Sequence, residues 1–294
     1  MADLCFFSND IPIRGQTILG TKHTIGPGGK GSNQAVAAAR SGGNVNFITK
    51  IGEDAYGEMA LSLYKESGVN IDSIIIDSNL STGVAGIFID ETTGDNIINV
   101  VPGAAGKLEP KDIDEYSKNI KNSKIFLTQL ETPIETTLYG LQKAKQFECL
   151  TILNPAPATE LPDDIFQNID FFTPNETEAG FYLNENLTTD KDIEAAGKEF
   201  LNKGVKNIII TLGNKGSYFA NKDECFFQEP LKLKSEVIDT TGAGDAFNGA
   251  LSVALVNNLD YKSSLVFATK VAGISTTRLG AANAMPTEKE IEIY

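Results

Sequence analysis

The sequence predicts an α/β protein with a mostly parallel central sheet, and three observations lead to this fold class. From about residue 111 onward, apolar runs alternate with helix-like segments, which is typical of a doubly wound layer with helices on both faces. Runs such as Ile208–Ile210 are apolar without interruption, as in parallel strands that are buried on both sides. The first hundred residues instead carry short strand-like runs between Gly- and Asn-rich turns. These early runs predict a small separate β-sheet, formed by two excursions from the main layer.

The individual elements follow from these patterns. A helix is expected over residues 32–41, because the segment is rich in alanine, Ser32 is a suitable N-cap and Gly42 is a suitable stop. A hairpin turn is expected at Thr92–Asp95. Strands are expected at 4–8, 17–25, 83–90, 96–101, 124–130, 150–153, 169–173 and 207–212, and a hairpin at 217–228. Further helices are expected at 111–121, 133–146, 190–203, 243–257 and 262–276.

Composition excludes several classes of partner and site. The net charge of −14 opposes binding to nucleic acid and to anionic membranes, so neither is expected as a partner. The cysteines Cys5, Cys149 and Cys225 are odd in number and lack metal-ligand spacing, which agrees with a reducing compartment. His23 is the only histidine, so a His-rich metal site is excluded. With no signal-peptide pattern and no apolar run of the about 20 residues that span a bilayer, we expect a cytoplasmic protein.

The most informative segment is Asp239–Asp245, DTTGAGD, which leads into a helix of small and apolar residues. The start of a helix presents free N–H groups and the positive end of the helix dipole, so it attracts anions. Asp245 lies in the first turn of this helix. It either caps the helix or serves as a base beside a bound phosphate, and the second interpretation predicts a phosphotransferase.

Other polar segments follow apolar strands. Gly28–Asn33 joins a strand to a helix but is not a P-loop, since Gly31 follows Lys30 where Ser or Thr is required; alone it is as readily a connector as a site. Asn175–Glu178 is either a capping box or a ligand contact at a strand end. Because ligands of open α/β sheets bind at the carboxyl ends of strands, these segments together indicate one polar, glycine-rich edge.

These segments resemble the PfkB family of sugar kinases. The resemblance covers nearly the whole chain, in order and with similar spacing, and its DTTGAGD run is highly specific for the family. The runs that carry it are GGKGSNQAVAAARSGG (28–43), NPAPATELP (154–162), TPNETEA (173–179), TLGNKG (211–216) and DTTGAGDAFNGAL (239–251). The first two runs point to the ribokinases within the family.

The resemblance implies a three-layer α/β/α core over residues 28–81 and 102–294, with a β lid over 1–27 and 82–101 through which two copies dimerise. It implies ATP-dependent phosphorylation of the ribose 5-hydroxyl. Another pentose such as 2-deoxyribose is the runner-up substrate. A sugar- or nucleotide-binding protein without turnover is the alternative from a different class.

The resemblance also implies roles for individual residues. Asp245 would be the general base, and the amides of Gly242, Ala243 and Gly244 would form an anion hole for the transferring phosphoryl group. The sugar would be held by Asp3, Gly29, Lys30, Gly31, Asn33, Glu131 and Asp245. ATP would be held by Asn175, Thr211, Leu212, Gly213, Asn214, Lys215, Gly216, Gly244 and Thr269. Glu178 would help to hold Mg²⁺, and an activating K⁺ would be held by Asp239, Thr241, Ser275, Arg278, Gly280 and Ala284.

The sequence departs from the family pattern at its start. Members of the family begin with an apolar strand that ends in Gly-Ser-x-Asn-x-Asp. The spacing from Asp3 to Thr17 and on to Gly28 fits this pattern and places Met1 on the asparagine. The first core strand is therefore absent from this sequence: either the start codon is misassigned, or the sheet has lost this strand and with it one sugar contact.

Overall fold

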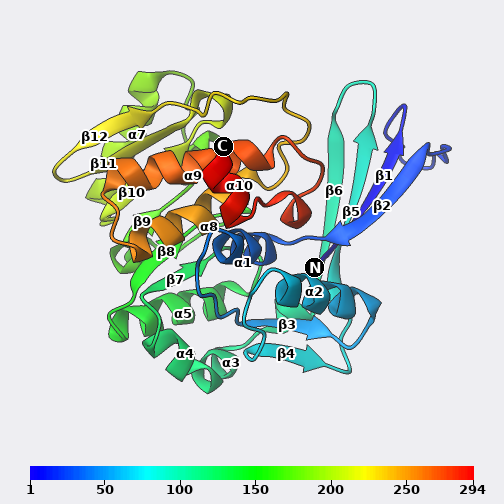
Figure 1. The fold of residues 1–294 in the computed structure, drawn as a ribbon, viewed down its shortest axis with the longest axis horizontal. Helices are drawn as coiled ribbons and strands as arrows, with labels where there is room; N and C mark the ends of the chain where they lie inside the picture. The colour runs from blue at the N-terminus through cyan, green and yellow to red at the C-terminus, as the bar shows by residue number, and fades with distance from the viewer.

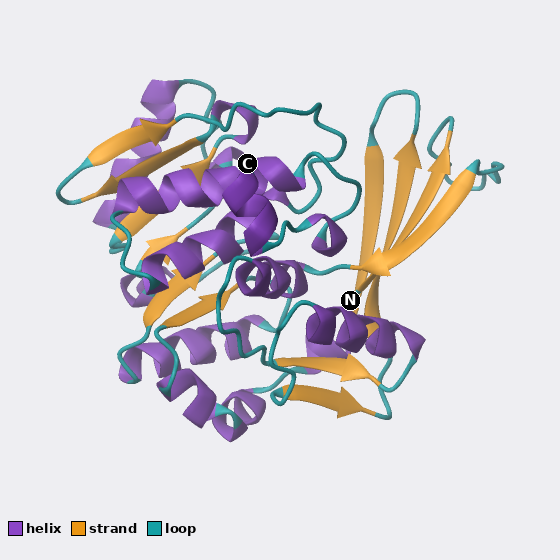
Figure 2. Ribbon diagram, in the orientation of Figure 1, coloured by secondary structure: helices purple, strands orange, loops and turns teal.

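The computed structural model describes residues 1–294 and consists of an α/β body with a β-sheet that stands beside it (Figures 1 and 2). Strands β1 to β12 span Ala2–Ser8, Lys22–Pro27, Thr49–Gly52, Ile74–Asp77, Thr82–Asp90, Asn96–Gly103, Ile125–Thr128, Leu150–Leu153, Phe171–Phe172, Asn207–Thr211, Ser217–Asn221 and Cys225–Gln228. Helices α1 to α10 span Lys30–Arg40, Ala55–Glu66, Pro110–Glu115, Ser117–Lys121, Ile134–Gln146, Glu176–Leu183, Asp190–Asn202, Ala243–Val256, Tyr261–Ser275 and Glu288–Ile293. Short 3₁₀ turns lie at Ala104–Lys107, Asp163–Asn168, Gly213–Lys215 and Ala282–Ala284.

The body has three layers, because successive residues of its strands are buried on opposite faces. Ile209 of β10 packs in the cluster that holds residues of α1, α8 and α9, whereas Ile208 and Ile210 pack in the cluster that holds residues of α5, α6 and α7. This alternation is the period of two that a strand imposes. The continuous apolar runs in the sequence therefore report helices on both faces of the sheet, as predicted.

The central layer is in two parts. One sheet has the order β12-β11-β10-β9-β8-β7, in which β7 to β10 are parallel and the last hairpin is antiparallel. The other is the parallel pair β3-β4. No strand joins β3 to β7. A cavity of about 450 Å³ lies between them, lined by residues of both strands and of α1.

The separate sheet has the order β2-β1-β5-β6. Its β1 and β5 run parallel, while β2 and β6 are antiparallel to their neighbours. One end of this sheet reaches the start of α1, since the N–H of Gly28 donates to the carbonyl of Met1 at 3.0 Å. None of the helices combines the length and the apolar character needed to cross a bilayer.

Several predicted elements differ from the structure. The strand expected at 17–25 begins only at Lys22, where the pairing of β1 with β2 ends at Phe7; before it, Thr21 donates its N–H to the carbonyl of Phe7 at 2.8 Å but does not extend the strand. The helix expected over 111–121 is broken at Tyr116, whose φ and ψ of −100° and 17° leave the helical region. The expected strand 169–173 is paired only at Phe171–Phe172. The patterns also do not predict β3, α2 and β4, whose strands are only four residues long.

The start of α1 is a further correction. Ser32 is not the N-cap; it is buried inside the helix, which begins at Lys30. The cap position is Gly29, whose φ of 91° is in the left-handed region that glycine tolerates. No side chain caps this helix end. The first of its N–H groups, that of Lys30, donates instead to the side chain of Glu131.

Candidate active site

The start of α8 presents unengaged hydrogen-bond donors. The cap residue Gly242 has a φ of 77°, and a Cβ atom there would lie 3.0 Å from a neighbouring side chain, so glycine fits this position. The N–H groups of Gly242, Gly244 and Asp245 have no acceptor in the chain. The N–H of Ala243 instead donates to the carbonyl of Thr240 at 3.2 Å. The helix start can thus bind an anion, although one of the three amides expected in the anion hole is already engaged.

Asp245 is a buried carboxylate, with an exposed fraction of 6%. Its Oδ2 accepts a hydrogen bond from Asn33 Nδ2 at 2.8 Å, and its Oδ1 accepts one from Gln34 Nε2 at 2.9 Å. Burial raises the pKa of Asp245, while the Lys30 ammonium and these two amides oppose the rise. A carboxylate offers about four lone-pair sites, so the side chain keeps the capacity to accept a proton.

The glycines before α1 let two acids approach the backbone. A Cβ atom at Gly28 would lie only 2.0 Å from the carboxylate of Asp3. The N–H of Lys30 donates to Glu131 Oε2 at 2.7 Å, and a Cβ at Gly29 would lie 3.6 Å from that oxygen. Because glycine has no side chain, the backbone at the start of α1 can lie directly against Asp3 of β1 and Glu131, which follows β7.

Four acids lie near enough to Lys30 for its charge to act on the pKa of each, and the amino group of Met1 acts on those of Asp3 and Glu131 as well. Burial is the largest influence on Asp3, Glu131, Glu178 and Asp245, and it raises all four pKa values, that of Asp3 to about 6. The positive charge of Lys30 opposes the rise in each case. Perturbed groups that converge in this way are typical of functional sites.

The residues expected around the nucleotide lie at the ends of β9 and β10. Asn175 caps α6: its Oδ1 accepts from the N–H of Glu178, and Glu178 Oε2 accepts from the N–H of Asn175, both at 2.8 Å. The capping box that the sequence suggested for these residues is therefore present in the structure. Asn175 also forms an isolated parallel β-bridge with Thr211. In the loop that follows β10, the N–H of Leu212 donates to the carbonyl of Gly216 at 2.8 Å. Gly213, Asn214 and Lys215 form the 3₁₀ turn of this loop, and Thr269 lies on α9 with its hydroxyl buried and unpaired.

Asp239 ties the segment before α8 to the segment after α9. Its Oδ1 accepts from the N–H of Thr241 and its Oδ2 from the N–H of Gly280, both at 2.9 Å. The guanidinium of Arg278 forms an ion pair with the carboxylate of Glu290, with a nitrogen–oxygen distance of 2.8 Å. Ser275 and Ala284, which were expected in the same ion site, are buried but make no hydrogen bond to Asp239. No group of three or more His, Cys, Asp or Glu side chains is arranged for a metal ion.

Sequence reasoning did not identify three amide side chains behind Asp245. Gln34 Nε2 donates to Asn154 Oδ1 at 2.9 Å, and Gln34 Oε1 accepts from Gln129 Nε2. A signal was present in the sequence: Asn33 and Gln34 are adjacent polar residues in an otherwise alanine-rich helix, and both are buried. Buried amides need partners, and here the partner is the predicted base.

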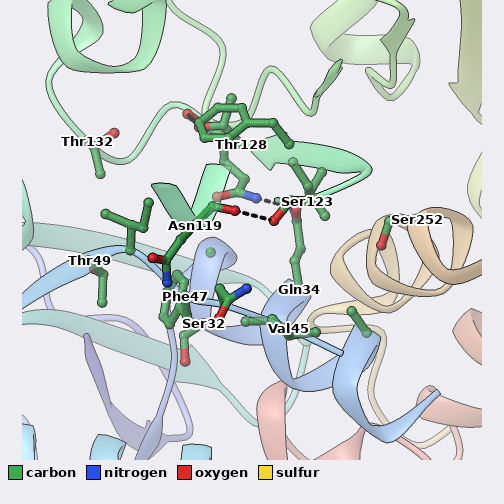
Figure 3. Close-up of a pocket in the computed structure, with 18 of the residues that line it drawn as sticks. Ser32, Gln34, Val45, Phe47, Thr49, Asn119, Ser123, Thr128, Thr132 and Ser252 are labelled. Carbon is green, nitrogen blue, oxygen red and sulfur yellow. Dashed lines mark hydrogen bonds between the residues drawn. The ribbon is translucent and has the colours of Figure 1, made fainter. Parts of the chain in front are cut away.

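The cavity between β3 and β7 opens toward this site (Figure 3). Figure 3 shows Ser32 and Gln34 of α1 on one side of it and Thr128 at the end of β7 on the other. Phe47, in the segment that leads into β3, lies next to Ser32 in the figure, and Thr49, the first residue of β3, also lines the cavity. The same cavity reaches Gly29, Gly31 and Glu131, which belong to the expected sugar site.

Known proteins resemble this chain over its full length. Residues 1–288 match the sequence profile described as the pfkB family carbohydrate kinase. A deoxyribokinase of Salmonella typhi is 32% identical over 295 residues, which cover 100% of this chain and 95% of that protein. The bifunctional ribokinase/ribose-5-phosphate isomerase A of Fructilactobacillus sanfranciscensis is 38% identical over 265 residues, which cover 90% of this chain but only about half, 48%, of that protein.

A solved structure agrees with the profile. The Arabidopsis thaliana ribokinase complexed with ribose and ATP has a TM-score of 0.93 and 29% identity to this chain, over 99% of this chain and 95% of that one. The fold is therefore the ribokinase-like three-layer arrangement. With a profile match that leaves out only the last few residues, the chain belongs to the PfkB family of carbohydrate kinases and is a phosphotransferase that acts on a sugar.

Proposed function

We propose that the protein transfers the γ-phosphoryl group of ATP to the 5-hydroxyl of D-ribose. One observation carries this proposal: a buried carboxylate, Asp245, lies in the first turn of a helix whose neighbouring N–H groups have no acceptor. A base and an anion site are thereby adjacent, which is the pair that transfer of a phosphoryl group to an alcohol requires. The convergence of Asp3, Glu131 and Lys30 on the same point supplies charged groups for sugar hydroxyls.

In this proposal each group has a defined task. Asp245 accepts the proton of the ribose hydroxyl as the oxygen bonds to the γ-phosphorus. The bond between that phosphorus and the β,γ-bridging oxygen breaks, and its electron pair leaves with ADP. The free N–H groups of Gly242 and Gly244 stabilise the charge on the transferring group. Asn175 and the Thr211–Gly216 loop contact the nucleotide from the ends of β9 and β10, with Thr269 toward the adenine.

The donors present fit two cations. Glu178 uses Oε2 to accept from Asn175, so its second oxygen remains for Mg²⁺, a hard cation that prefers oxygen ligands. Mg²⁺ would neutralise phosphate charge, as in other kinases. The oxygen-rich turn around Asp239, Thr241 and Gly280 fits K⁺, with backbone carbonyls as the further ligands. Arg278, whose side chain pairs with Glu290, could contribute only its backbone, as would Ser275 and Ala284.

We further propose that the chain acts in the cytoplasm as a homodimer, with the β2-β1-β5-β6 sheet as a lid over the sugar. Four exposed apolar residues of this sheet support the dimer, since they share the face opposite to Asp3 and would be covered by a second copy: Phe6, Ile25, Ile97 and Val101. Sedimentation of the parent and of an Ile97→Lys variant measures this directly. A parent that sediments as a monomer contradicts the dimer.

The substrate assignment has one competitor with a specific observation behind it. The Salmonella typhi deoxyribokinase matches the entire chain, so 2-deoxyribose is the alternative sugar. The test measures ADP formation with ribose, 2-deoxyribose and fructose, and locates the phosphate on the product by ³¹P NMR. Ribose should give the highest kcat/KM and a 5-phosphate. A higher kcat/KM for 2-deoxyribose would favour the alternative, and sugar binding without ADP formation would show a non-catalytic protein.

A further inference from the structure

Gln34 is almost fully buried, with 1% of its surface exposed, and its amide is completely paired. Its Nε2 donates to Asp245 Oδ1 and to Asn154 Oδ1, each at 2.9 Å, and its Oε1 accepts from Gln129 Nε2. Rotating the amide by half a turn would place its oxygen against two oxygens and its nitrogen against a donor. The network therefore allows one orientation of Gln34, in which an N–H points at the carboxylate.

The partners of Gln34 are themselves fixed to the sheet. Asn154 follows β8, and its Nδ2 donates to the carbonyl of Thr173 at 2.9 Å. Gln129 follows β7 directly. Gln34 thus connects a carboxylate on α8 to the ends of two parallel strands. Asn33 holds the other oxygen, Oδ2, of the same carboxylate at 2.8 Å, so each oxygen of Asp245 has one amide donor.

We propose that Gln34 is a positioning residue that holds the carboxylate of Asp245 in the orientation and ionisation state needed to accept the sugar proton. This inference rests on the proposed role of Asp245 as the base. In this proposal Gln34 contacts the base and not the substrates; it acts by fixing the plane of the carboxylate. A base that is misplaced or protonated loses rate even when the substrates still bind.

Other groups also influence the ionisation of Asp245, and they set the background for the test. Lys30 of α1 favours the carboxylate. Asp3 of β1, Glu131 after β7 and Glu178 of α6 interact unfavourably with its negative charge. Because these groups remain unchanged in a Gln34 variant, a shift in the pH profile reports the loss of the amide donor.

The experiment compares steady-state kinetics of Gln34→Met and Gln34→Glu with the parent across pH 5–9. Methionine keeps the approximate volume but cannot donate, so kcat should fall at least about tenfold while KM for ribose and ATP changes little. The acid limb of the kcat profile should move up by about one pH unit, since one hydrogen bond to the carboxylate is lost. Glutamate adds a like charge next to Asp245 and should shift the limb further.

The control is Ser32→Ala, which alters a buried residue of the same helix whose hydroxyl has no partner. It should keep the parental kcat and pH profile. If Gln34→Met does not fold, as judged by its thermal transition, Gln129→Leu takes its place; it frees the amide of Gln34 and should shift the acid limb in the same direction. A folded variant of either residue with parental kcat and pH profile overturns the inference. If Asp245→Asn is inactive in the same assay, the proposed function survives that result; if Asp245→Asn is active, both fail.

Discussion

At the scale of single residues, Asp245 shows how opposing effects determine the pKa of a proposed base. Burial raises its pKa and so favours the protonated form, which cannot accept a further proton from the sugar. The amides of Asn33 and Gln34 and the charge of Lys30 act in the opposite direction. A general base works best when its pKa lies near the working pH. The surroundings of Asp245 therefore combine burial, which raises its pKa, with three groups that favour its charged form.

The first prediction concerns this carboxylate. Asp245→Asn should lower kcat by about 10²–10⁴-fold, because the amide cannot accept the proton. Ribose binding should be largely retained, since asparagine has the same size and can still contact the hydroxyl. Kinetics give the first quantity and calorimetric titration with ribose gives the second. If the variant retains a large share of the parental kcat, another group is the base.

Asp3 leads to a prediction on pH. Burial raises its pKa from 3.8 to about 6, so below that pH it is protonated and cannot accept hydrogen bonds from a sugar diol as a carboxylate. KM for ribose should rise below pH 6, by up to about tenfold for each pH unit. Asp3→Asn should have a higher KM at neutral pH and lack the part of the rise that Asp3 causes. A parental pH dependence of KM in this variant would exclude Asp3 from the sugar site.

The same pKa shift has a consequence for stability, and its sign is opposite to that for activity. The folded state binds this proton more tightly than the unfolded chain does, so the contribution of Asp3 to stability falls as the pH rises from 3.8 through about 6. Asp3→Asn should therefore be more stable than the parent at pH 7 and lose this advantage at pH 4. Urea unfolding at the two pH values measures the difference.

At the scale of elements, the start of α8 depends on the segments that hold it. Asp239 connects Thr241 just before the helix to Gly280 beyond α9 through both of its oxygens. The N–H groups at the helix start must already point toward the phosphoryl group when it arrives, because preorganised donors need no rearrangement during the reaction. An ion bound beside Asp239 would fix this backbone without contacting either substrate.

This arrangement predicts activation by K⁺ over Na⁺. The initial rate in K⁺-free buffer should increase at least about tenfold when K⁺ is added, given that loss of one donor from such a site costs about 10²–10³-fold. Na⁺ at equal ionic strength is the matched control, and Asp239→Asn should require more K⁺ for half-activation. Equal rates in the two salts would remove the ion from the proposal.

The elements also show what could be predicted from the sequence. The run Ile208–Ile210 indicated a strand with both faces buried, and the small residues of Asp239–Asp245 indicated a helix start, because local composition determines both. The short strands β3 and β4 have no such local signature. The bonds of Asp245 to Asn33 and Gln34 join residues 212 and 211 positions apart. Contacts of this kind result from how the layers pack, so a single sequence could not predict them without the family resemblance.

At the scale of the whole molecule, the central layer is divided into two sheets. The facing edges of β3 and β7 have no strand between them, although residues of both strands line the cavity there. Backbone groups at such edges lose hydrogen bonds at about 1–3 kcal/mol for each one that is buried away from water. The cavity is also lined by Gly29 and Glu131, which belong to the proposed sugar site. Stability and sugar binding should therefore depend on the same gap.

The last prediction follows from the position of Met1. A Cβ atom at Gly29 would lie 3.1 Å from the side chain of Met1 and 3.6 Å from Glu131, which follows β7. A segment fused in front of Met1 would therefore enter the cavity at the carboxyl end of β7 and lie parallel to it. A fusion of alternating Val and Ile should raise the melting temperature and lower KM for ribose, because it pairs the open edges and fixes the backbone of Asp3. A Gly-Ser fusion of equal length is the control, since it cannot bury apolar surface. If the unfused chain matches the Val-Ile fusion in both measurements, the gap costs neither stability nor affinity, and the edges of β3 and β7 must be satisfied by water or by another chain.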